Sequence, residues 1–178
     1  MQEVVLVNEQ DEPLGTMEKI EAHEKALLHR AFSVFIFNSK GEMLLQQRAL
    51  SKYHSPGLWT NACCSHPFPG EPVQQAAVRR LNEELGFTIP LQKAFHFTYR
   101  AEFDNGLTEH EFDHVFTGVY NGGFHLNEEE VQAIEFKTSE DIETELQTLP
   151  QQYTEWFKIA FPLLKEWVQK NKVVHEAT

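Results

Sequence analysis

Cysteine and positive charge are both scarce in this sequence of 178 residues. The two cysteines, Cys63 and Cys64, are adjacent, and adjacent residues cannot form an ordinary structural disulfide. Fifteen Lys and Arg residues against 27 Asp and Glu residues give a formal net charge of −12. That charge argues against a protein that grips DNA, RNA or an anionic membrane by bulk electrostatics. An anionic small molecule would need local cations or a bound metal.

Long apolar runs, internal repeats and flexible linkers are absent as well. No hydrophobic stretch approaches the roughly 18 residues of a membrane span, and the first residues, MQEVVLVNEQ, lack the basic start of a secretory signal. At 41% hydrophobic residues, the composition is ordinary for a globular protein. We therefore expect one cytoplasmic domain over residues 1–178, a monomer or a weak dimer, with no nucleic-acid or membrane partner.

Several segments have the pattern typical of strands. They are rich in β-branched and aromatic residues, and they cover residues 4–7, 31–38, 43–45, 95–101 and 109–120. The turn sequence Ser39-Lys40-Gly41 separates the second and third of these segments, which predicts a hairpin. Strands are thus expected mainly in the middle of the chain.

Two segments have apolar residues at helical spacing. The first covers residues 72–85, with Pro72 suited to its first turn and Gly86 to the position just past its end. The second covers residues 151–170, and Pro162 is expected to kink or interrupt it. Helices and strands together predict an α/β or α+β sandwich.

The segment from Asn61 to Pro67 places a thiol near an imidazole. In an extended chain Cys64 and His66 project from the same face, because strand side chains alternate with a period of two. Cys63 then faces the other way, as a small residue of the core. Two interpretations of Cys64 stay open at this point: a buried thiol, or a reactive group in an electropositive or metal-rich setting.

A second unusual segment carries three acidic residues at alternate positions. Glu109, Glu111 and Asp113 would line one face of a strand, where like charges repel unless they are solvated or neutralised by a cation. His110 and His114 would lie on the opposite face, where we interpret them as structural or surface histidines. The acidic face is therefore a candidate cation site.

His23 and His29 lie six residues apart, which is out of phase for one helix face. An irregular segment could still bring them together. With His66, Glu109 and Glu111 they could form a mixed imidazole and carboxylate site for Mn²⁺, Mg²⁺ or Zn²⁺. The alternative is a set of unrelated surface or core histidines.

Two arginine and glutamate pairs follow on the first predicted helix. Arg79 with Glu83, and Arg80 with Glu84, are four residues apart. They could be ordinary surface ion pairs, each contributing a few tenths of a kcal/mol. The alternative is a helix whose carboxylates hold a metal against a phosphate.

The sequence around this helix resembles the Nudix box, whose pattern is G-x5-E-x7-R-E-U-x-E-E-x-G-U with U apolar. The corresponding residues are Ser65-x5-Glu71-x7-Arg79-Arg80-Leu81-x-Glu83-Glu84-x-Gly86-Phe87. Ser65 replaces the first Gly, and Arg80 replaces the Glu that follows Arg. The second departure puts a base into the acidic metal-binding set, which argues against nucleoside diphosphate hydrolysis.

Nearly the whole chain is similar to the type I isopentenyl-diphosphate Δ-isomerases, which share the Nudix fold. The matching segments, in order, are Glu18–His23 (EKIEAH), Leu28–Ser33 (LHRAFS), Gln47-Arg48, Ser51-Lys52, Trp59–Pro67 (WTNACCSHP), Tyr99–Ala101, Glu109–Glu111 and the helix at Trp156. The resemblance implies an α/β/α sandwich with a mixed central sheet. It also implies interconversion of isopentenyl and dimethylallyl diphosphate in isoprenoid biosynthesis, through a tertiary carbocation and without flavin.

The resemblance further implies a role for individual residues. The ligands of one divalent metal, Mn²⁺, Mg²⁺ or Zn²⁺, would be His23, His29, His66, Glu109 and Glu111. Cys64 would be one catalytic acid or base, and Glu111, assisted by Tyr99, would serve the other face of the substrate. Glu84 and the main-chain carbonyl of Cys64 would hold a Mg²⁺ ion on the diphosphate.

The small-molecule diphosphate would be bound by Lys19, Arg48, Lys52, Ser65 and Arg80. Trp156 would turn its ring toward the cation, with Trp59 and Tyr99 lining the site. Two alternatives remain. One is a diverged Nudix hydrolase of a small diphosphate, and the other is a non-catalytic protein with a structural metal site.

Overall fold

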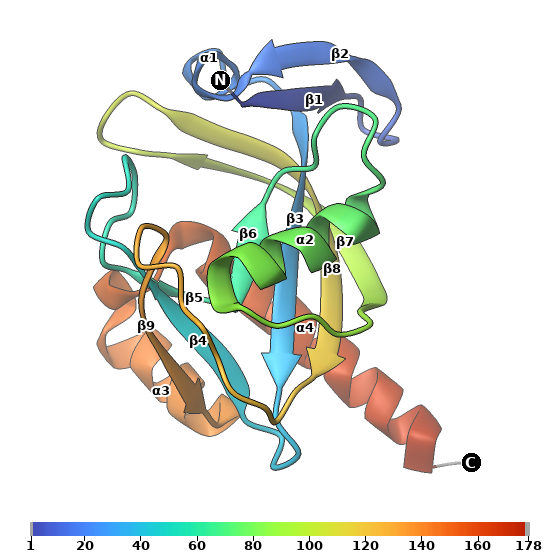
Figure 1. Cartoon of the computed structure of the whole chain (residues 1–178), viewed down its shortest axis with the longest axis vertical. Helices are drawn as coiled ribbons and strands as arrows, with labels where there is room; N and C mark the ends of the chain where they lie inside the picture. The colour runs from blue at the N-terminus through green and yellow to red at the C-terminus, as the bar shows by residue number, and fades with distance from the viewer. Residues whose placement is uncertain (1, 177–178) are drawn as a thin grey trace.

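One mixed sheet organises the chain (Figure 1). The computed structural model describes residues 2–176, with side chains described as far as residue 171. Within these residues the strands are β1 (Glu3–Val7), β2 (Pro13–Glu18), β3 (His29–Phe37), β4 (Met43–Arg48), β5 (Trp59–Thr60), β6 (Cys63–Ser65), β7 (Gln92–Glu102), β8 (Thr108–Val119) and β9 (Val131–Lys137). The helices are α1 (Lys19–Glu24), α2 (Val73–Leu85), α3 (Ser139–Thr148), the 3-10 turn η1 (Pro150–Gln152) and α4 (Glu155–Glu176).

Strand β3 lies at the centre of the sheet. It pairs in parallel with β8, in a register that runs from His29↔Glu111 to Phe37↔Val119. Strand β7 pairs antiparallel with β8, and β6 pairs antiparallel with β3. Strand β4 pairs antiparallel with both β5 and β9. The first residue of β3 and the early part of β8 therefore meet at one end of the sheet.

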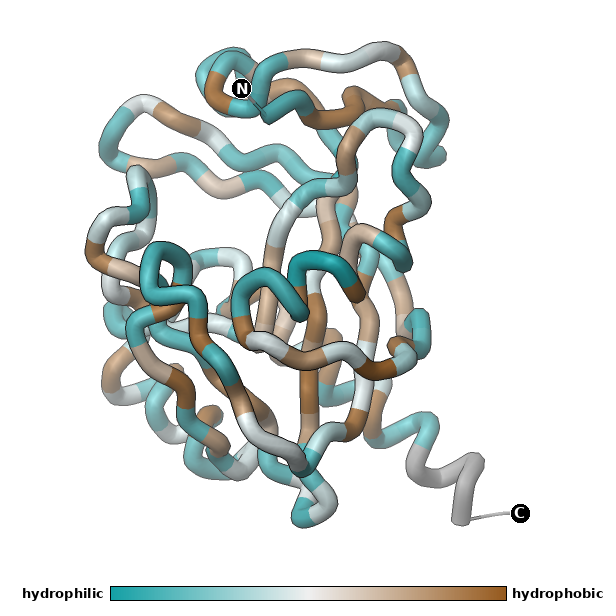
Figure 2. Tube along the Cα trace, in the orientation of Figure 1, coloured by the Kyte–Doolittle hydropathy of each residue, from teal (hydrophilic) through white to brown (hydrophobic). Residues whose placement is uncertain are grey.

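Side chains of β3 alternate between two hydrophobic cores. Val34 and Ile36 pack with Leu81 of α2 on one face, while Phe35 packs with Phe157 of α4 on the other, at 6.4 Å between ring centroids. Figure 1 shows α2 in front of the sheet and α4 behind it. Figure 2 shows hydrophobic residues running along β3 between these helices. The predicted α/β/α sandwich with a mixed central sheet is confirmed.

The predicted strands are confirmed, but their connection differs from the expectation. They correspond to β1, β3, β4, β7 and β8. Strands β3 and β4 were expected to form a hairpin, and they meet at the single antiparallel pair Phe37↔Met43. The hairpin does not extend further because β3 pairs with β6 and β4 pairs with β5 beyond this point.

Both predicted helices are present, with differences at their prolines. Gly86 ends α2 with a φ of 79°, and a Cβ there would lie 2.7 Å from the backbone oxygen of His125. Pro72 lies in the capping position before α2 and not in its first turn. Pro162 does not interrupt α4, because buried apolar residues on both sides of it keep the helix packed. No helix in the described part of the chain is long and apolar enough to cross a membrane.

The β1–β2 hairpin leads into α1 and covers one end of the sheet, at the top of Figure 1. Its turn is held by Asp11, which has a φ of 64° and accepts a hydrogen bond from Arg30 Nε at 2.7 Å. Asp11 Oδ2 also lies 2.9 Å from His114 Nε2. These contacts fix the hairpin, and with it α1, against β3 and β8.

Candidate active site and metal centre

Three histidines and one glutamate converge at this end of the sheet. His23 lies on α1, His29 is the first residue of β3, His66 follows β6, and Glu111 lies on β8 in register with His29. One ligand atom of each lies within 4.8 Å of the others. The structure thus brings together four of the five residues that the sequence suggested as metal ligands.

Backbone carbonyls determine where the proton lies on two of these rings. His23 Nδ1 lies 2.6 Å from the carbonyl oxygen of Lys19, and His29 Nδ1 lies 2.9 Å from that of Leu27. A carbonyl oxygen only accepts, so each Nδ1 must carry the proton and donate it. The Nε2 atoms are left with free lone pairs, as is typical of metal-binding histidines.

The lone pair of His29 faces a carboxylate, which His66 also contacts. Glu111 Oε2 lies 3.2 Å from His29 Nε2 and 2.8 Å from His66 Nε2. An unprotonated His29 Nε2 and a carboxylate oxygen repel each other at this distance, since neither supplies a proton. A divalent cation among the four groups would replace that repulsion with coordination, and this ligand set suits Mn²⁺, Zn²⁺ or Mg²⁺. The residues therefore fit a divalent metal.

The protonation states of these groups also suit a metal. Burial lowers the pKa of His66 to about 4 and lowers the pKa of His23. Both rings are therefore neutral at physiological pH. Burial alone would raise the pKa of Glu111, but its contacts with His66 and His29 hold that pKa well below its usual value. Neutral imidazoles and an ionised carboxylate are the forms that bind cations.

Glu109, the fifth suggested ligand, lies outside the four-residue group. The Tyr99 hydroxyl lies 2.6 Å from Glu109 Oε2 and 2.5 Å from Glu111 Oε1. That hydroxyl has one proton and can donate to only one carboxylate at a time. Burial and the charge of Glu111 raise the pKa of Glu109 well above its usual value. Glu109 Oε1 has no hydrogen-bond partner among the described residues, so it is available to a cation.

The two cysteines point in different directions from β6. Cys64 lines a pocket beside the metal-binding group, with its Sγ 3.1 Å from Asn61 Oδ1. Burial raises the pKa of Cys64 well above its usual value, so this residue is a neutral thiol that can donate a proton. Cys63 is fully buried in the core, as expected, but its thiol also donates to Glu84 Oε2 at 3.0 Å. Cys63 therefore supports a carboxylate of the pocket as well as packing in the core.

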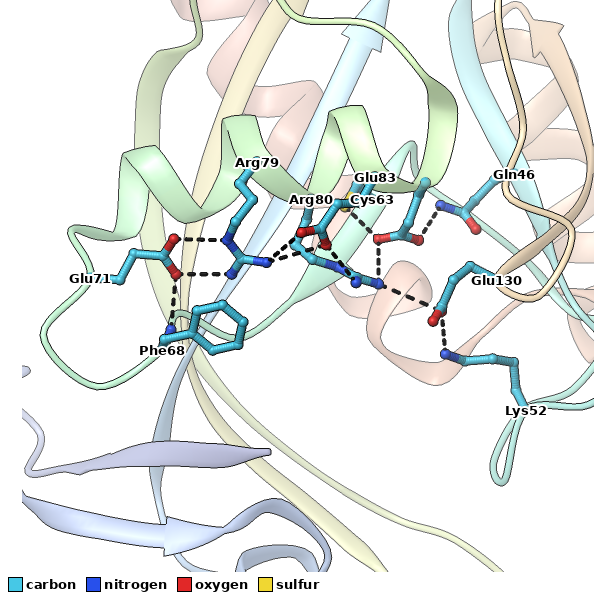
Figure 3. A network of polar contacts seen from close by, with 10 residues as sticks. Gln46, Lys52, Cys63, Phe68, Glu71, Arg79, Arg80, Glu83 and Glu130 are labelled. Carbon is cyan, nitrogen blue, oxygen red and sulfur yellow. Dashed lines mark hydrogen bonds and ion pairs between the residues drawn. The ribbon is translucent and has the colours of Figure 1, made fainter. Parts of the chain in front are cut away.

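Positive and negative side chains alternate along one wall of the same pocket. The suggested diphosphate-binding residues all line it: Lys19, Arg48, Lys52, Ser65 and Arg80. Lys52 Nζ lies 2.5 Å from Glu130, whose Oε2 is also 3.5 Å from Arg80. Arg80 contacts Glu84 at 3.1 Å. Figure 3 shows the network continuing along α2 through Arg79. Such alternation suits an anionic ligand that binds together with a cation.

The two arginine and glutamate pairs of α2 differ in their surroundings. Arg79 and Glu83 lie 3.2 Å apart, and the Glu83 side chain is 42% exposed, as in an ordinary surface pair. Glu84 is buried and lines the pocket, where Gln46 Nε2 donates to it at 3.3 Å. The surface interpretation thus fits the outer pair, and the inner pair belongs to the pocket.

Trp156 forms an aromatic wall of the pocket from the first turn of α4. It is buried, and its indole N–H has no hydrogen-bond partner in the part of the chain that the structure describes. The Arg48 guanidinium lies 5.1 Å from its ring centre. Trp59 was expected to line the site as well, but it packs against the core formed with α3 and α4 and is not part of the pocket wall.

Among the pocket residues that sequence reasoning missed are His54 and Glu130. His54 stacks on Phe103 at 5.2 Å and meets Trp156 edge-on at 5.7 Å, and burial lowers its pKa to about 3. Its position two residues after Lys52 was the available signal. Glu130 ends a run of three glutamates that is typical of a solvated surface, and its contacts with Lys52 and Arg80 reveal its place.

Removing the metal should weaken the fold measurably. Dialysis against a chelator is expected to lower the Tm by roughly 5–10 °C, since a ligand that binds only the folded state at about 100 times its Kd adds about 2.7 kcal/mol. Adding back Mn²⁺, Zn²⁺ or Mg²⁺ should restore the Tm, which differential scanning calorimetry can follow. The same Tm with and without chelator, in protein shown by elemental analysis to have lost its metal, would contradict this expectation.

Comparison with known proteins gives close relatives in sequence. Residues 27–158 match the family model of the NUDIX domain. The isopentenyl-diphosphate Delta-isomerase of Pectobacterium atrosepticum is 50% identical over 170 residues, which cover 96% of this chain and 95% of that protein. A protein of the same name from Aliivibrio fischeri is 48% identical, over 89% of this chain and 92% of its own length.

Solved structures show the same fold at low sequence identity. The DR0079 protein from Deinococcus radiodurans superposes with a TM-score of 0.75 at 19% identity, over 90% of this chain and 98% of that one. The MutT protein from Methanosarcina mazei gives a TM-score of 0.65 at 21% identity, over 82% of this chain and 96% of its own. At these identities the likeness concerns the fold alone.

Proposed function

The chain belongs to the NUDIX domain family and, within it, to the isopentenyl-diphosphate Delta-isomerases, and we propose that it interconverts isopentenyl and dimethylallyl diphosphate in the pocket described above. The observation that carries the proposal is that acid–base groups and cationic side chains line the same pocket. A neutral thiol, Cys64, and an ionised carboxylate, Glu111, lie there beside a row of cations. The reaction needs a proton donor, a proton acceptor and a binding site for a diphosphate.

The double bond moves when one carbon gains a proton and another loses one. No carbonyl group acidifies the protons of this substrate, so protonation to a tertiary cation is the accessible route. Cys64 would give its proton to the terminal carbon and would itself be left as a thiolate. Glu111 would then take the proton from the carbon two positions away, with Tyr99 donating a hydrogen bond to the same carboxylate. The substrate gains one proton and loses one, and the enzyme is restored when Cys64 regains a proton and Glu111 releases one by exchange with solvent.

The diphosphate would bind at the charged wall of the pocket. Lys52 and Arg80 are separated there by Glu130, and Arg80 adjoins Glu84. We assign Lys19, Arg48 and Ser65 to the same end of the substrate. Binding energy from this remote group would hold the hydrocarbon tail against the reacting side chains.

Two divalent cations complete the proposal. His23, His29, His66, Glu111 and the free oxygen of Glu109 would hold one, and Glu84 with the Cys64 carbonyl would hold a Mg²⁺ ion on the diphosphate. Bound there, these cations would supply charge neutralisation to the buried carboxylates and to the diphosphate.

The ring of Trp156 should stabilise the carbocation. Trp156→Leu is expected to lower kcat about 30-fold, because a desolvated cation–π contact is worth about 2 kcal/mol. Trp156→Phe keeps an aromatic face and should lose much less. Steady-state kinetics with isopentenyl diphosphate would compare the two variants, and equal losses would show that the ring only fills space.

Tyr99→Phe should separate hydrogen bonding from metal binding. The variant keeps the buried ring but loses the hydroxyl that contacts Glu109 and Glu111. We expect kcat to fall about tenfold, the effect of losing about 1.4 kcal/mol of hydrogen bonding. Metal content, measured by elemental analysis, should stay unchanged. A variant that loses metal in proportion to its activity would place Tyr99 in the metal site instead.

The activity itself is tested by incubating the purified protein with isopentenyl diphosphate and Mg²⁺ and following the products by ¹H and ³¹P NMR. Formation of dimethylallyl diphosphate with both phosphates retained supports the proposal. Release of phosphate or of isopentenyl monophosphate would identify a hydrolase. No reaction in protein shown to contain its metal would favour a structural metal site.

A further inference from the structure

The Cys64 sulfur has a hydrogen-bond partner, a buried amide, that neither the catalytic nor the metal-binding roles above include. Asn61 Oδ1 lies 3.1 Å from Cys64 Sγ, whereas Ser33 Oγ lies 3.5 Å from it. Asn61 is fully buried. We propose that Asn61 is a positioning residue that holds the thiol proton of Cys64 and sets the direction from which that proton is delivered. The proposal rests on the assignment of Cys64 as proton donor.

The orientation of the Asn61 amide follows from its other contacts. Its Nδ2 group donates to the carbonyl oxygens of Val34, at 2.9 Å, and Cys63, at 3.0 Å. Its Oδ1 accepts from Thr60 Oγ1 at 2.9 Å. A flipped amide would set its oxygen against two carbonyl oxygens, so the observed orientation is the one that the network permits. Oδ1 can only accept, and the proton between Asn61 and Cys64 therefore belongs to the sulfur.

Ser33 does not donate a hydrogen bond to the sulfur. It lies opposite Cys64 in the β3–β6 pairing, and its single hydroxyl proton goes to Asp113 Oδ2 at 2.7 Å. Toward the sulfur Ser33 therefore offers only a lone pair. The thiol proton has two acceptors on the protein side, of which Asn61 Oδ1 is the nearer. Rotation about the Cβ–Sγ bond would turn the proton from that oxygen toward a bound alkene.

Asn61 is itself held by a chain of buried hydroxyls. Thr154 Oγ1 donates to Thr60 Oγ1 at 3.1 Å, and Thr60 donates in turn to Asn61. Thr154 immediately precedes α4, and its Oγ1 accepts from the backbone N–H of Phe157 at 3.3 Å. Both threonines are buried. One hydrogen-bonded chain thus fixes the proton donor relative to the first turn of α4, which carries Trp156.

Infrared spectroscopy of the S–H stretch tests the contact directly. The protein has two thiols, so the spectrum of the wild type minus that of Cys64→Ala isolates the Cys64 band. We expect this band at the low frequency of a hydrogen-bonded thiol. Asn61→Leu should move it to the frequency of a free S–H group, and the matched variant Ser33→Ala should leave it in place. A free S–H band in the wild type, or a shift in Ser33→Ala alone, overturns the proposal.

Kinetics add a second readout that a purely structural role would not give. Asn61→Leu should lower kcat about tenfold with KM within about twofold, because one neutral hydrogen bond of about 1.4 kcal/mol orients the proton but does not bind the diphosphate. A proportional rise in KM with kcat unchanged would contradict the proposal. If Asn61→Leu does not fold, the wild-type band still decides. Full isomerase activity of Cys64→Ala would instead overturn the proposed function, whatever the band shows.

Discussion

Replacing Cys64 with alanine is expected to reduce isomerisation by roughly 10³-fold or more, the scale of losing a general acid. The thiol is a neutral proton donor in the pocket, and burial keeps it protonated at physiological pH. Alanine removes the proton without placing a charge or extra volume in the site. The fold and the metal content should therefore survive. Steady-state rates, circular dichroism and elemental analysis of the same preparation would establish this.

Cys63→Ala is the matched control. It removes a neighbouring thiol that points into the core and donates to Glu84, but it leaves the sulfur in the pocket untouched. We expect a loss of stability with most of the activity retained. Substantial turnover by Cys64→Ala would remove Cys64 from the mechanism. An inactive but folded Cys63→Ala would mean that the chemistry depends on the other thiol.

The second large effect is expected for Glu111→Gln, which should impair metal binding and chemistry together. Glu111 Oε2 contacts two of the three histidines of the metal-binding group, and Oε1 accepts from Tyr99. The amide has no negative charge to offer a cation and is too weak a base to remove a proton. Metal affinity should fall by roughly 100-fold or more, and kcat by roughly 10³-fold.

Tyr99→Phe serves as the comparison for Glu111→Gln, because it removes the hydrogen bond to this carboxylate and keeps the carboxylate itself. A metal titration followed by calorimetry would give the affinity of each variant, and rates at saturating metal would give the chemical loss. Unchanged metal affinity together with full activity in Glu111→Gln would contradict the dual role of Glu111 in metal binding and proton removal. Recovery of full activity at saturating metal would reduce Glu111 to a ligand.

Strand periodicity was enough to predict the two short motifs of the site. The alternation of Cys64 and His66 against Cys63 appears in the structure, with Cys63 in the core. The alternation of Glu109 and Glu111 also holds, and both face the pocket. A period of two fixes which side chains share a face once a strand is recognised. These parts of the site could therefore be predicted from the local sequence.

The convergence of His23 with His29 could not be derived from spacing. It depends on the short helix α1 and on a turn in which Ala26 takes a φ of 55°, a conformation that sequence patterns seldom signal for alanine. His54 is held in the pocket by contacts with distant parts of the chain, namely Phe103 on the β7–β8 loop and Trp156 on α4. Such residues are identified by tertiary structure and not by local pattern.

The missed elements had weak patterns of their own. Helix α3 buries only Ile142, so it lacks the apolar stripe that marked α2. Its remaining signal was the cap, in which Thr138 Oγ1 accepts from the backbone N–H of Asp141. Strand β9 lies beside β4 and alternates poorly between buried and exposed residues. Amphipathic patterning identifies an element only where one of its faces is clearly buried.

The most direct test of the central claim is the reaction in deuterated water. The wild-type protein with its metal, isopentenyl diphosphate and Mg²⁺ would be followed by ¹H and ²H NMR, beside Cys64→Ala. A thiol that exchanges with solvent should deliver deuterium to the terminal carbon, so dimethylallyl diphosphate with a deuterated methyl group is expected, and none in the variant. Dimethylallyl diphosphate formed at the normal rate without deuterium would show that the hydrogen moves within the substrate, and would contradict protonation by Cys64.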